Sequence, residues 1–111
     1  MNWIPLVNED QVEEIKKNST NKPQVIFKHS SRCGTSSMAQ NRLNRNEFPQ
    51  EIDFYFLDII HHRNISNKIA KDFEVRHESP QVLVINNGKC VYDESHSGIQ
   101  MDDIKQNAGV A

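Results

Sequence analysis

Residues 30–38 read Ser30-Ser31-Arg32-Cys33-Gly34-Thr35-Ser36-Ser37-Met38. The apolar run at residues 25–27 before this stretch predicts a buried strand, and apolar residues at helical spacing after it predict a helix. A lone cysteine, Cys33, therefore stands where a strand gives way to a helix. The free N–H groups and the dipole of a helix start favour negative charge, and the thiolate is the form of cysteine that attacks disulfides.

Cysteine as a residue type favours a structural interpretation, because cysteine is among the most frequently buried residue types. The neighbours of Cys33 indicate otherwise, since Ser, Arg, Gly and Thr form loops and helix caps more readily than cores. We therefore take Cys33 as the candidate reactive residue of the chain.

The length, charge and cysteine content exclude several classes of protein. A chain of 111 residues predicts a single domain over residues 1–111. The net charge of -2 argues against a nucleic-acid binder, which needs a basic face. No stretch approaches the roughly 18 apolar residues of a membrane helix, and residues 1–10 lack the basic and apolar regions of a signal peptide. Two cysteines are too few for a disulfide scaffold. We therefore expect a cytoplasmic protein.

The hydrophobic pattern predicts alternating strands and helices. Expected strands cover residues 3–6, 24–29, 52–59, 81–85 and 90–92, and expected helices cover 8–17, 35–46, 65–73 and a segment after residue 97. Asn8 or Asp10 is expected to cap the first helix, Asn64 the third, and a capping box at Ser97-Gly98-Ile99-Gln100 the last. Residues 74–79 are expected to form a polar loop.

This order predicts an α/β domain with helices on both faces of a sheet. Strands joined through a helix are expected to be parallel, with right-handed crossovers. The Asn87-Gly88 pair lies between two apolar runs and predicts an antiparallel hairpin at the end of the sheet.

A cysteine that opens a helix after the first central strand resembles the thioredoxin fold. A second similarity is the run Phe73-Glu74-Val75-Arg76-His77-Glu78-Ser79-Pro80, followed by an apolar strand and the Asn-Gly turn. The resemblance implies a three-layer α/β/α domain with a central mixed sheet of four or five strands flanked by helices. It also implies that Pro80 follows a cis peptide bond beside the cysteine, which leaves the Ser79 backbone free to pair with an extended thiol substrate.

Two stretches of sequence restrict the resemblance from the thioredoxin fold to one family. The resemblance is carried by Lys28-His29-Ser30-Ser31-Arg32-Cys33-Gly34-Thr35-Ser36-Ser37-Met38-Ala39 and by Val75-Arg76-His77-Glu78-Ser79-Pro80-Gln81. The chain resembles the YtxJ-like family of monothiol bacilliredoxins over nearly its whole length. The His-Glu-Ser-Pro-Gln run together with Cys-x-x-Ser is specific, whereas Cys-x-x-Ser alone is weak. Thr35 stands where the family usually has isoleucine, which leaves the attacking sulfur in place.

The resemblance implies a monothiol thiol-disulfide oxidoreductase that removes bacillithiol from S-bacillithiolated cytosolic proteins. Cys33 would attack the mixed disulfide, and a second bacillithiol would regenerate it, because Ser36 cannot form a disulfide. Bacillithiol is then a co-substrate, with no bound cofactor, and the partners are client proteins rather than nucleic acid or membrane. We expect a monomer.

The predicted site consists of Cys33 and Ser36 as catalytic residues, where Ser36 could donate a hydrogen bond to the thiolate. Arg32 could meet a carboxylate of bacillithiol. The predicted substrate-binding residues are Arg32, Gly34, Thr35, Ser79 and Pro80.

Three further residues are expected to lie outside the site. His29 is expected to be a satisfied or exposed histidine, and the His61-His62 pair is expected to face solvent without binding a metal, because adjacent residues do not share a face. Cys90 follows the predicted hairpin turn, which in this fold lies far from the cysteine loop, so we expect it to be structural.

Two other functions fit the sequence. A Cys-Gly-x-Ser site resembles that of monothiol glutaredoxins, which carry an iron–sulfur cluster between two protomers. A thioredoxin-fold interaction module without catalysis is the other alternative, and it would have an unreactive Cys33. Arsenate-reductase chemistry is disfavoured, because it normally needs additional redox cysteines.

Overall fold

The structure, a computed structural model, describes residues 2–110 and is built on a mixed sheet of five strands in the order β1-β3-β2-β4-β5. The strands are β1 (Ile4–Pro5), β2 (Gln24–His29), β3 (Asp53–Asp58), β4 (Gln81–Asn86) and β5 (Lys89–Ser95). The central strand β2 pairs parallel with β3 and antiparallel with β4. All six of its residues are buried, as expected of a strand covered on both faces.

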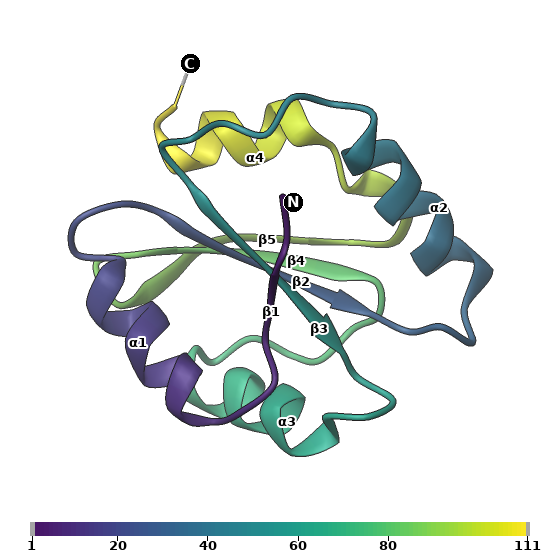
Figure 1. The fold of residues 1–111 in the computed structure, drawn as a ribbon, viewed down its shortest axis with the longest axis horizontal. Coiled ribbons are helices and arrows are strands. Elements are labelled where there is room, and N and C mark those ends of the chain that lie inside the picture. Colours follow the sequence, from purple (N-terminus) through teal and green to yellow (C-terminus); the bar gives the residue numbers. More distant parts are fainter. Residues whose placement is uncertain (1, 111) are drawn as a thin grey trace.

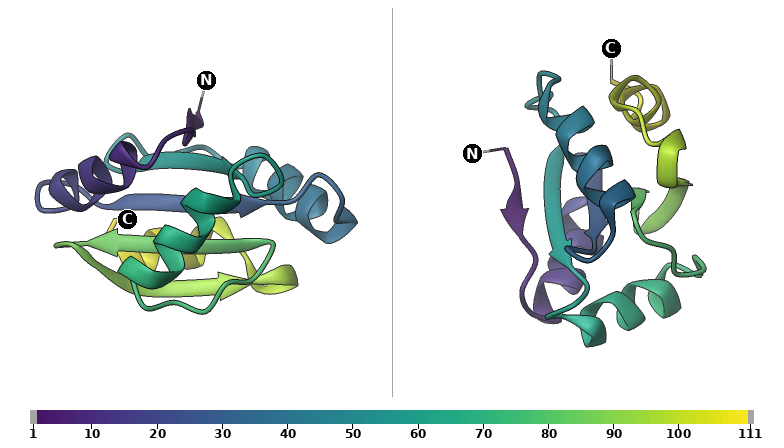
Figure 2. Two further views of the ribbon diagram at one scale, coloured as in Figure 1. Left: turned by 90° about the horizontal axis from the view of Figure 1, so that it is seen from below. Right: turned by 90° about the vertical axis from the view of Figure 1, so that its right-hand side faces the viewer.

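Helices cover both faces of this sheet. They are α1 (Asp10–Asn18), α2 (Gly34–Asn44), α3 (Arg63–Asp72) and α4 (Met101–Ala108), with a 3-10 turn, η1, at His96–Gly98. Figures 1 and 2 show α1 and α3 on one face and α2 and α4 on the other. The predicted three-layer α/β arrangement with a mixed sheet is therefore confirmed.

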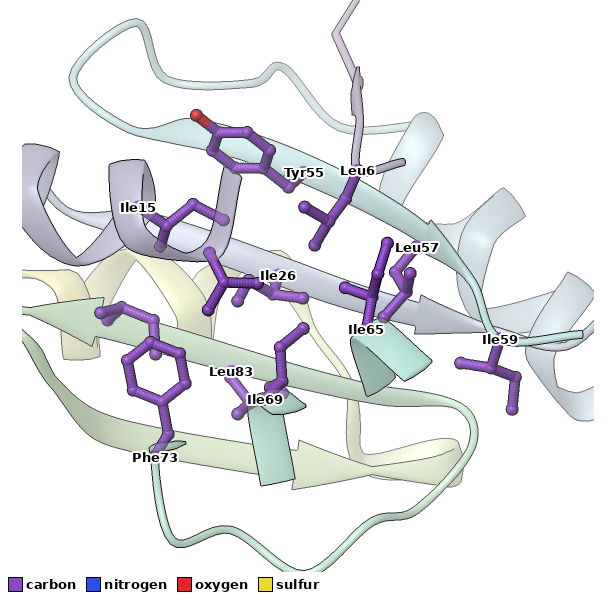
Figure 3. Close-up of a cluster of buried hydrophobic side chains, with 12 residues drawn as sticks. Leu6, Ile15, Ile26, Tyr55, Leu57, Ile59, Ile65, Ile69, Phe73 and Leu83 are labelled. Atoms are coloured by element: carbon purple, nitrogen blue, oxygen red, sulfur yellow. The ribbon is translucent and has the colours of Figure 1, made fainter. Parts of the chain in front are cut away.

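Side chains alternate between two hydrophobic clusters, one on each face of the sheet. Ile26 and Leu83 point to the α1–α3 face, where Ile65 and Ile69 of α3 pack against them (Figure 3). The residues that alternate with them on β2 and β4 pack on the other face with α2 and α4: Val25, Phe27, Val82, Val84, Ala39, Leu43 and Ile104. The period of two along buried strands thus fills both layers of the core.

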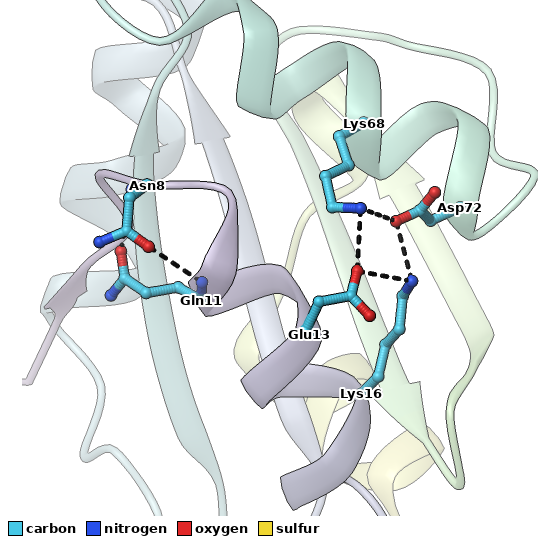
Figure 4. Close-up of polar contacts among 6 residues, drawn as sticks. All are labelled: Asn8, Gln11, Glu13, Lys16, Lys68 and Asp72. Carbon is cyan, nitrogen blue, oxygen red and sulfur yellow. Dashed lines mark hydrogen bonds and ion pairs between the residues drawn. The ribbon is translucent and has the colours of Figure 1, made fainter.

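A network of charged side chains joins α1 to α3 on the surface (Figure 4). Lys16 and Lys68 each lie 2.8 Å from Asp72, and they lie 3.1 and 2.8 Å from Glu13. These side chains are partly exposed, so solvent screens the pairs and each contributes little to stability. The network orients two helices whose apolar faces supply most of the stability.

The start of α1 and the final hairpin confirm two local predictions. Asn8 Oδ1 accepts a hydrogen bond from the Gln11 N–H, and Gln11 Oε1 accepts one from the Asn8 N–H, both at 3.1 Å. Asn87 and Gly88 form the turn between β4 and β5 with positive φ angles of 52° and 78°. Such angles are favourable for Asn and Gly, which explains the strength of the Asn-Gly signal.

The prediction that all helix-linked strands run parallel is wrong for β4. This strand follows α3, yet it is antiparallel to β2. The reason is the segment at residues 73–80, which carries the chain back along the sheet to the end where α3 began before β4 starts (Figure 3). This segment is not simply a polar loop, because Val75 packs against the core.

Two predicted helix caps are also wrong. The helix α3 begins at Arg63, so Asn64 lies inside its first turn and donates a hydrogen bond to Glu9 Oε2 at 2.9 Å. Residues 96–98 form η1 instead of opening a helix, and α4 begins at Met101. The intervening Ile99 stays extended because its side chain is fully buried in the core.

Within residues 2–110, no helix combines the length and the apolar character needed to cross a membrane.

Truncating a fully buried side chain of α3 tests this packing. Replacing Ile69 with alanine should lower the free energy of unfolding by about 2–5 kcal/mol, because it removes apolar contacts and leaves a cavity. Urea unfolding followed by circular dichroism measures the change. The control is Ile4→Ala on the edge strand, where the side chain is 38% exposed and the loss should be clearly smaller. Equal losses would contradict the assignment of the core.

Candidate functional site

The loop between β2 and α2 presents Cys33 at a helix start. Cys33 has extended backbone angles (φ -116°, ψ 115°) and directly precedes Gly34, the first residue of α2. Its N–H donates to the Ser30 C=O at 3.1 Å, and its C=O accepts from the N–H groups of Ser36 and Ser37 at 3.1 and 3.3 Å. The side chain is half-buried and the thiol is free. The structure thus places the sulfur of Cys33 at the N-terminus of α2.

The surroundings of Cys33 suit a negative charge on its sulfur. The first turn of α2 contains no acidic residue, and the amide groups of a helix start favour an anion. Arg32, Gly34 and Thr35 are exposed around the cysteine. A Cβ added at Gly34 would meet no atom within 4 Å, so close packing does not require glycine at this position.

The hydroxyl of Ser36 bonds to other partners than the Cys33 sulfur that its motif suggests. Its side chain is fully buried, and its Oγ accepts a hydrogen bond from the Ser30 N–H at 3.0 Å and lies 2.8 Å from His29 Nδ1. The Ser30 N–H occupies one lone pair of the oxygen, and the tautomer of the His29 ring decides whether the hydroxyl donates to Nδ1 or accepts from it. Among hydrogen bonds between described residues, none joins Ser36 Oγ to the sulfur of Cys33. The hydroxyl therefore fixes the loop that carries Cys33.

His29 was expected to lie outside the site, yet it holds Ser36. The ring packs against Phe56, with centroids 5.1 Å apart, and burial lowers its pKa, partly offset by the charge of Asp58. The lowered pKa favours the neutral form of this ring. The available signal was its place at the end of β2, in alternation with the buried Val25 and Phe27.

The proline loop lies at the same end of the sheet as Cys33. The Ser79–Pro80 peptide bond is cis, and the next residue, Gln81, pairs with Lys28 of β2. The Pro80 C=O accepts a hydrogen bond from the His96 N–H at 3.0 Å. Hydrogen bonds within residues 2–110 leave both backbone groups of Ser79 unused, and its Oγ is buried without a partner there. The two loops therefore flank one end of β2.

A buried lysine lies beneath this end of the sheet. Lys28 is fully buried, and its Nζ lies 3.3 Å from both the Ser66 C=O and His77 Nδ1. Burial lowers its pKa to about 8. The pKa of His77 is lowered by its burial and by the positive charges of Lys28 and Arg63. No motif in the sequence predicts the burial of this lysine.

Cys90 lies at the opposite end of the sheet. It pairs with Ile85, which in turn pairs with Gln24, the first residue of β2. The six residues of β2 span about 16 Å at ~3.3 Å per residue. Burial raises the pKa of the Cys90 thiol to about 11. This position supports the structural role expected for Cys90.

The histidine pair shows no sign of a metal site. His61 is exposed, as expected, and its Nδ1 lies 2.8 Å from Asp58 Oδ2, whereas His62 is half-buried. Within residues 2–110, no group of three His, Cys, Asp or Glu side chains could hold a metal ion.

The chain is similar to several known proteins. The family model of the monothiol bacilliredoxin BrxC matches residues 4–104. A solved structure described as a proposed oxidoreductase with a thioredoxin fold is 32% identical, with a TM-score of 0.83, over 96% of this chain and 93% of that chain. The thioredoxins of Malassezia sympodialis and Fasciola hepatica have TM-scores of 0.72 and 0.71, at 17% and 15% identity. Those matches cover 94% and 95% of this chain and 89% and 95% of theirs, and they show the fold alone.

The buried hydroxyl of Ser36 generates a test. Replacing Ser36 with alanine removes the acceptor of the Ser30 N–H, and leaving a buried donor unpaired costs about 1–3 kcal/mol of unfolding free energy. Chemical denaturation measures this loss. The neighbouring Ser37→Ala, at an exposed position, is the matched control and should be nearly neutral. Equal stability of the two variants would show that the hydroxyl does not fix the loop.

The buried Lys28 predicts a pH dependence of stability. Unfolded Lys28 holds its proton up to about pH 10.5, whereas the native residue loses it near 8, so the unfolded state binds more protons between these values. Stability of the wild type relative to Lys28→Met should therefore rise with pH across this window, by on the order of 3 kcal/mol. Denaturation at several pH values measures it. The exposed Lys71→Met should show no such difference, and a flat difference for Lys28→Met would contradict the burial of a titrating ammonium group.

Proposed function

The chain belongs to the monothiol bacilliredoxin family, and we propose that it removes bacillithiol from S-bacillithiolated proteins as a thiol-disulfide oxidoreductase. The observation that carries this proposal is a single half-buried cysteine, Cys33, at the N-terminus of α2, with a serine at the position where a dithiol site has its second cysteine. The 32% identity to an oxidoreductase-like thioredoxin fold supports redox chemistry in general.

In the first step, the Cys33 thiolate attacks the bacillithiol sulfur of a mixed disulfide on a client protein. The bond between Cys33 and bacillithiol forms while the bond between bacillithiol and the client breaks, and the client leaves as a thiolate. The positive end of the α2 dipole favours the attacking anion. No electrons are gained or lost overall, because one disulfide replaces another.

In the second step, a free bacillithiol thiolate attacks the bacillithiol sulfur bound to Cys33. Bacillithiol disulfide is released, and the Cys33 thiolate is restored. Ser36 cannot supply the second sulfur, and Cys90 lies at the far end of the sheet with its pKa raised to about 11. The resolving thiol must therefore come from outside the protein. Bacillithiol is a co-substrate, and the mechanism uses no bound cofactor.

The two loops at this end of the sheet form the proposed binding surface. The free backbone groups of Ser79 can pair with an extended client segment in the manner of an added strand, with Pro80 fixing the loop. Arg32 is exposed before the cysteine and can meet a carboxylate of bacillithiol, while Gly34 and Thr35 line the exposed helix start.

The partners proposed for the protein follow from this reaction. They are S-bacillithiolated client proteins and free bacillithiol, in the cytoplasm, where thiols are kept reduced. The reaction needs one active cysteine per chain, so a monomer is sufficient for it.

Transfer of bacillithiol to Cys33 is the direct test of the proposal. A bacillithiolated client protein is incubated with the wild type, and mass spectrometry follows both proteins. We expect the bacillithiol adduct to appear on Cys33 as the client thiol is released, and Cys33→Ser to reduce release to the uncatalysed rate, because the attacking sulfur is gone.

Cys90→Ser serves as the control and should release the client thiol almost as fast as the wild type. A large loss in that variant would make Cys90 the resolving thiol. If bacillithiol never moves to Cys33, the proposal is wrong. A visible absorption spectrum after anaerobic iron–sulfur reconstitution would instead favour a cluster carrier.

A further inference from the structure

Lys28 is buried in a position that costs free energy. Its side chain is fully inaccessible to solvent, and among the described residues no carboxylate forms an ion pair with its ammonium group. Buried lysines are rare unless they are paired, because desolvation of the charge is unfavourable. A hydrophobic residue of similar size would avoid this cost of desolvating a charge. The lysine therefore calls for an explanation other than packing.

The contacts of Lys28 join three elements that surround the site. Its Nζ lies 3.3 Å from the Ser66 C=O of α3 and 3.3 Å from Nδ1 of His77, in the segment that leads to Pro80. Ser66 Oγ also lies 3.1 Å from the same Nδ1. An ammonium group can only donate, so Nδ1 must be the unprotonated acceptor. The neutral ring is thus held by donors from β2 and α3.

The place of Lys28 in the sheet connects this cluster to the segment that ends at Pro80 and to the loop that carries Cys33. Lys28 is paired with Gln81, which directly follows the cis Ser79–Pro80 bond. The next residue of β2, His29, points to the other face and holds Ser36 of the cysteine loop. Adjacent residues of one buried strand thus anchor the proline segment on one face and the Cys33 loop on the other.

We propose that Lys28 is a positioning residue, which together with Ser66 and His77 holds residues 74–80 so that the Ser79 backbone is presented to the substrate bound at Cys33. This inference rests on the proposed function for its substrate, although the anchoring itself does not depend on it. Lys28 does not touch the reacting sulfur in this scheme, and it acts through the segment that His77 belongs to.

The cluster also predicts sensitivity to acid. Protonation of His77 turns Nδ1 from an acceptor into a donor, which then faces the ammonium group of Lys28. The charged groups acting on this ring are Lys28 from β2, Arg63 from α3 and Glu78 from its own segment, and only Glu78 favours the protonated form. Acid should therefore release the segment before it disturbs the rest of the fold.

Lys28→Met tests the proposal with two reactions of the same sulfur. Alkylation of Cys33 by iodoacetamide needs only the helix start and should keep its wild-type rate. Exchange with a peptide–bacillithiol mixed disulfide also needs the Ser79 backbone, and its kcat/KM should fall about tenfold or more through misplacement of the substrate. The variant should be at least as stable as the wild type at pH 7.

Nuclear magnetic resonance supplies a readout that is independent of activity. In Lys28→Met, amide hydrogen exchange around Ser79 should become faster, and the pKa of His77 should rise, because the neighbouring positive charge is removed. If the wild type does not act on the bacillithiol peptide, the proposed function fails, and these signals still decide whether Lys28 holds the segment. Unchanged signals would overturn the inference.

A second pair of variants covers the case in which Lys28→Met does not fold. His77→Asn can place an amide oxygen where Nδ1 lies, whereas His77→Leu removes the acceptor. Asparagine should retain most of the exchange rate that leucine loses. Below the lowered pKa of His77, the ratio of exchange to alkylation should fall in the wild type but not in His77→Asn, since asparagine at this position does not titrate. Parallel losses of alkylation and exchange, or equal rates in both variants, would refute a positioning role.

Discussion

Burial of the central strand on both faces constrains everything else in this molecule. The six residues of β2 are inaccessible to solvent and hydrogen-bonded to a neighbour on each side, so their side chains must alternate strictly between the two helical layers. A shift of one residue would exchange the contents of both cores. The same alternation sends Lys28 toward α3 and His29 toward α2. The register of one strand therefore decides how both loops of the site are attached to the fold.

Much of the fold could be predicted because its signals are local. The apolar runs, the Asn87-Gly88 turn and the helical spacing of Ile65 and Ile69 are visible within a few residues of sequence. The direction of β4 could not be predicted in this way, because it depends on where residues 73–80 lead the chain. The wrong cap at Ser97 has a similar cause, since burial of Ile99 outweighs a capping pattern.

In the site, too, the features with a local sequence signal could be predicted and those that depend on tertiary packing could not. Cys33 and the Ser79–Pro80 segment were predicted from motifs, because their residue types and spacing are specific. The bonding of Ser36 was not, since the motif gives the residue type but not which of its neighbours the hydroxyl meets. His29 had only its alternation with Val25 and Phe27 as a signal, and Lys28 and His77 carry no sequence signal for burial. A polar residue in a strand pattern is ordinarily assigned to the solvent side, and only the packing of α3 and the proline segment places Lys28 inside.

The separation of the two cysteines has a consequence under oxidative stress. A thiolate attacked by peroxide becomes a sulfenic acid, which proceeds to irreversible sulfinic and sulfonic acids unless another thiol condenses with it. Cys90 lies across the length of β2 and is half-buried as a protonated thiol, so it cannot rescue an oxidised Cys33 within the same chain. The lifetime of the reactive sulfur is therefore set by the concentration of small thiols around the protein. Once the small thiols around the protein are exhausted, an oxidant converts Cys33 to its irreversible oxidation products.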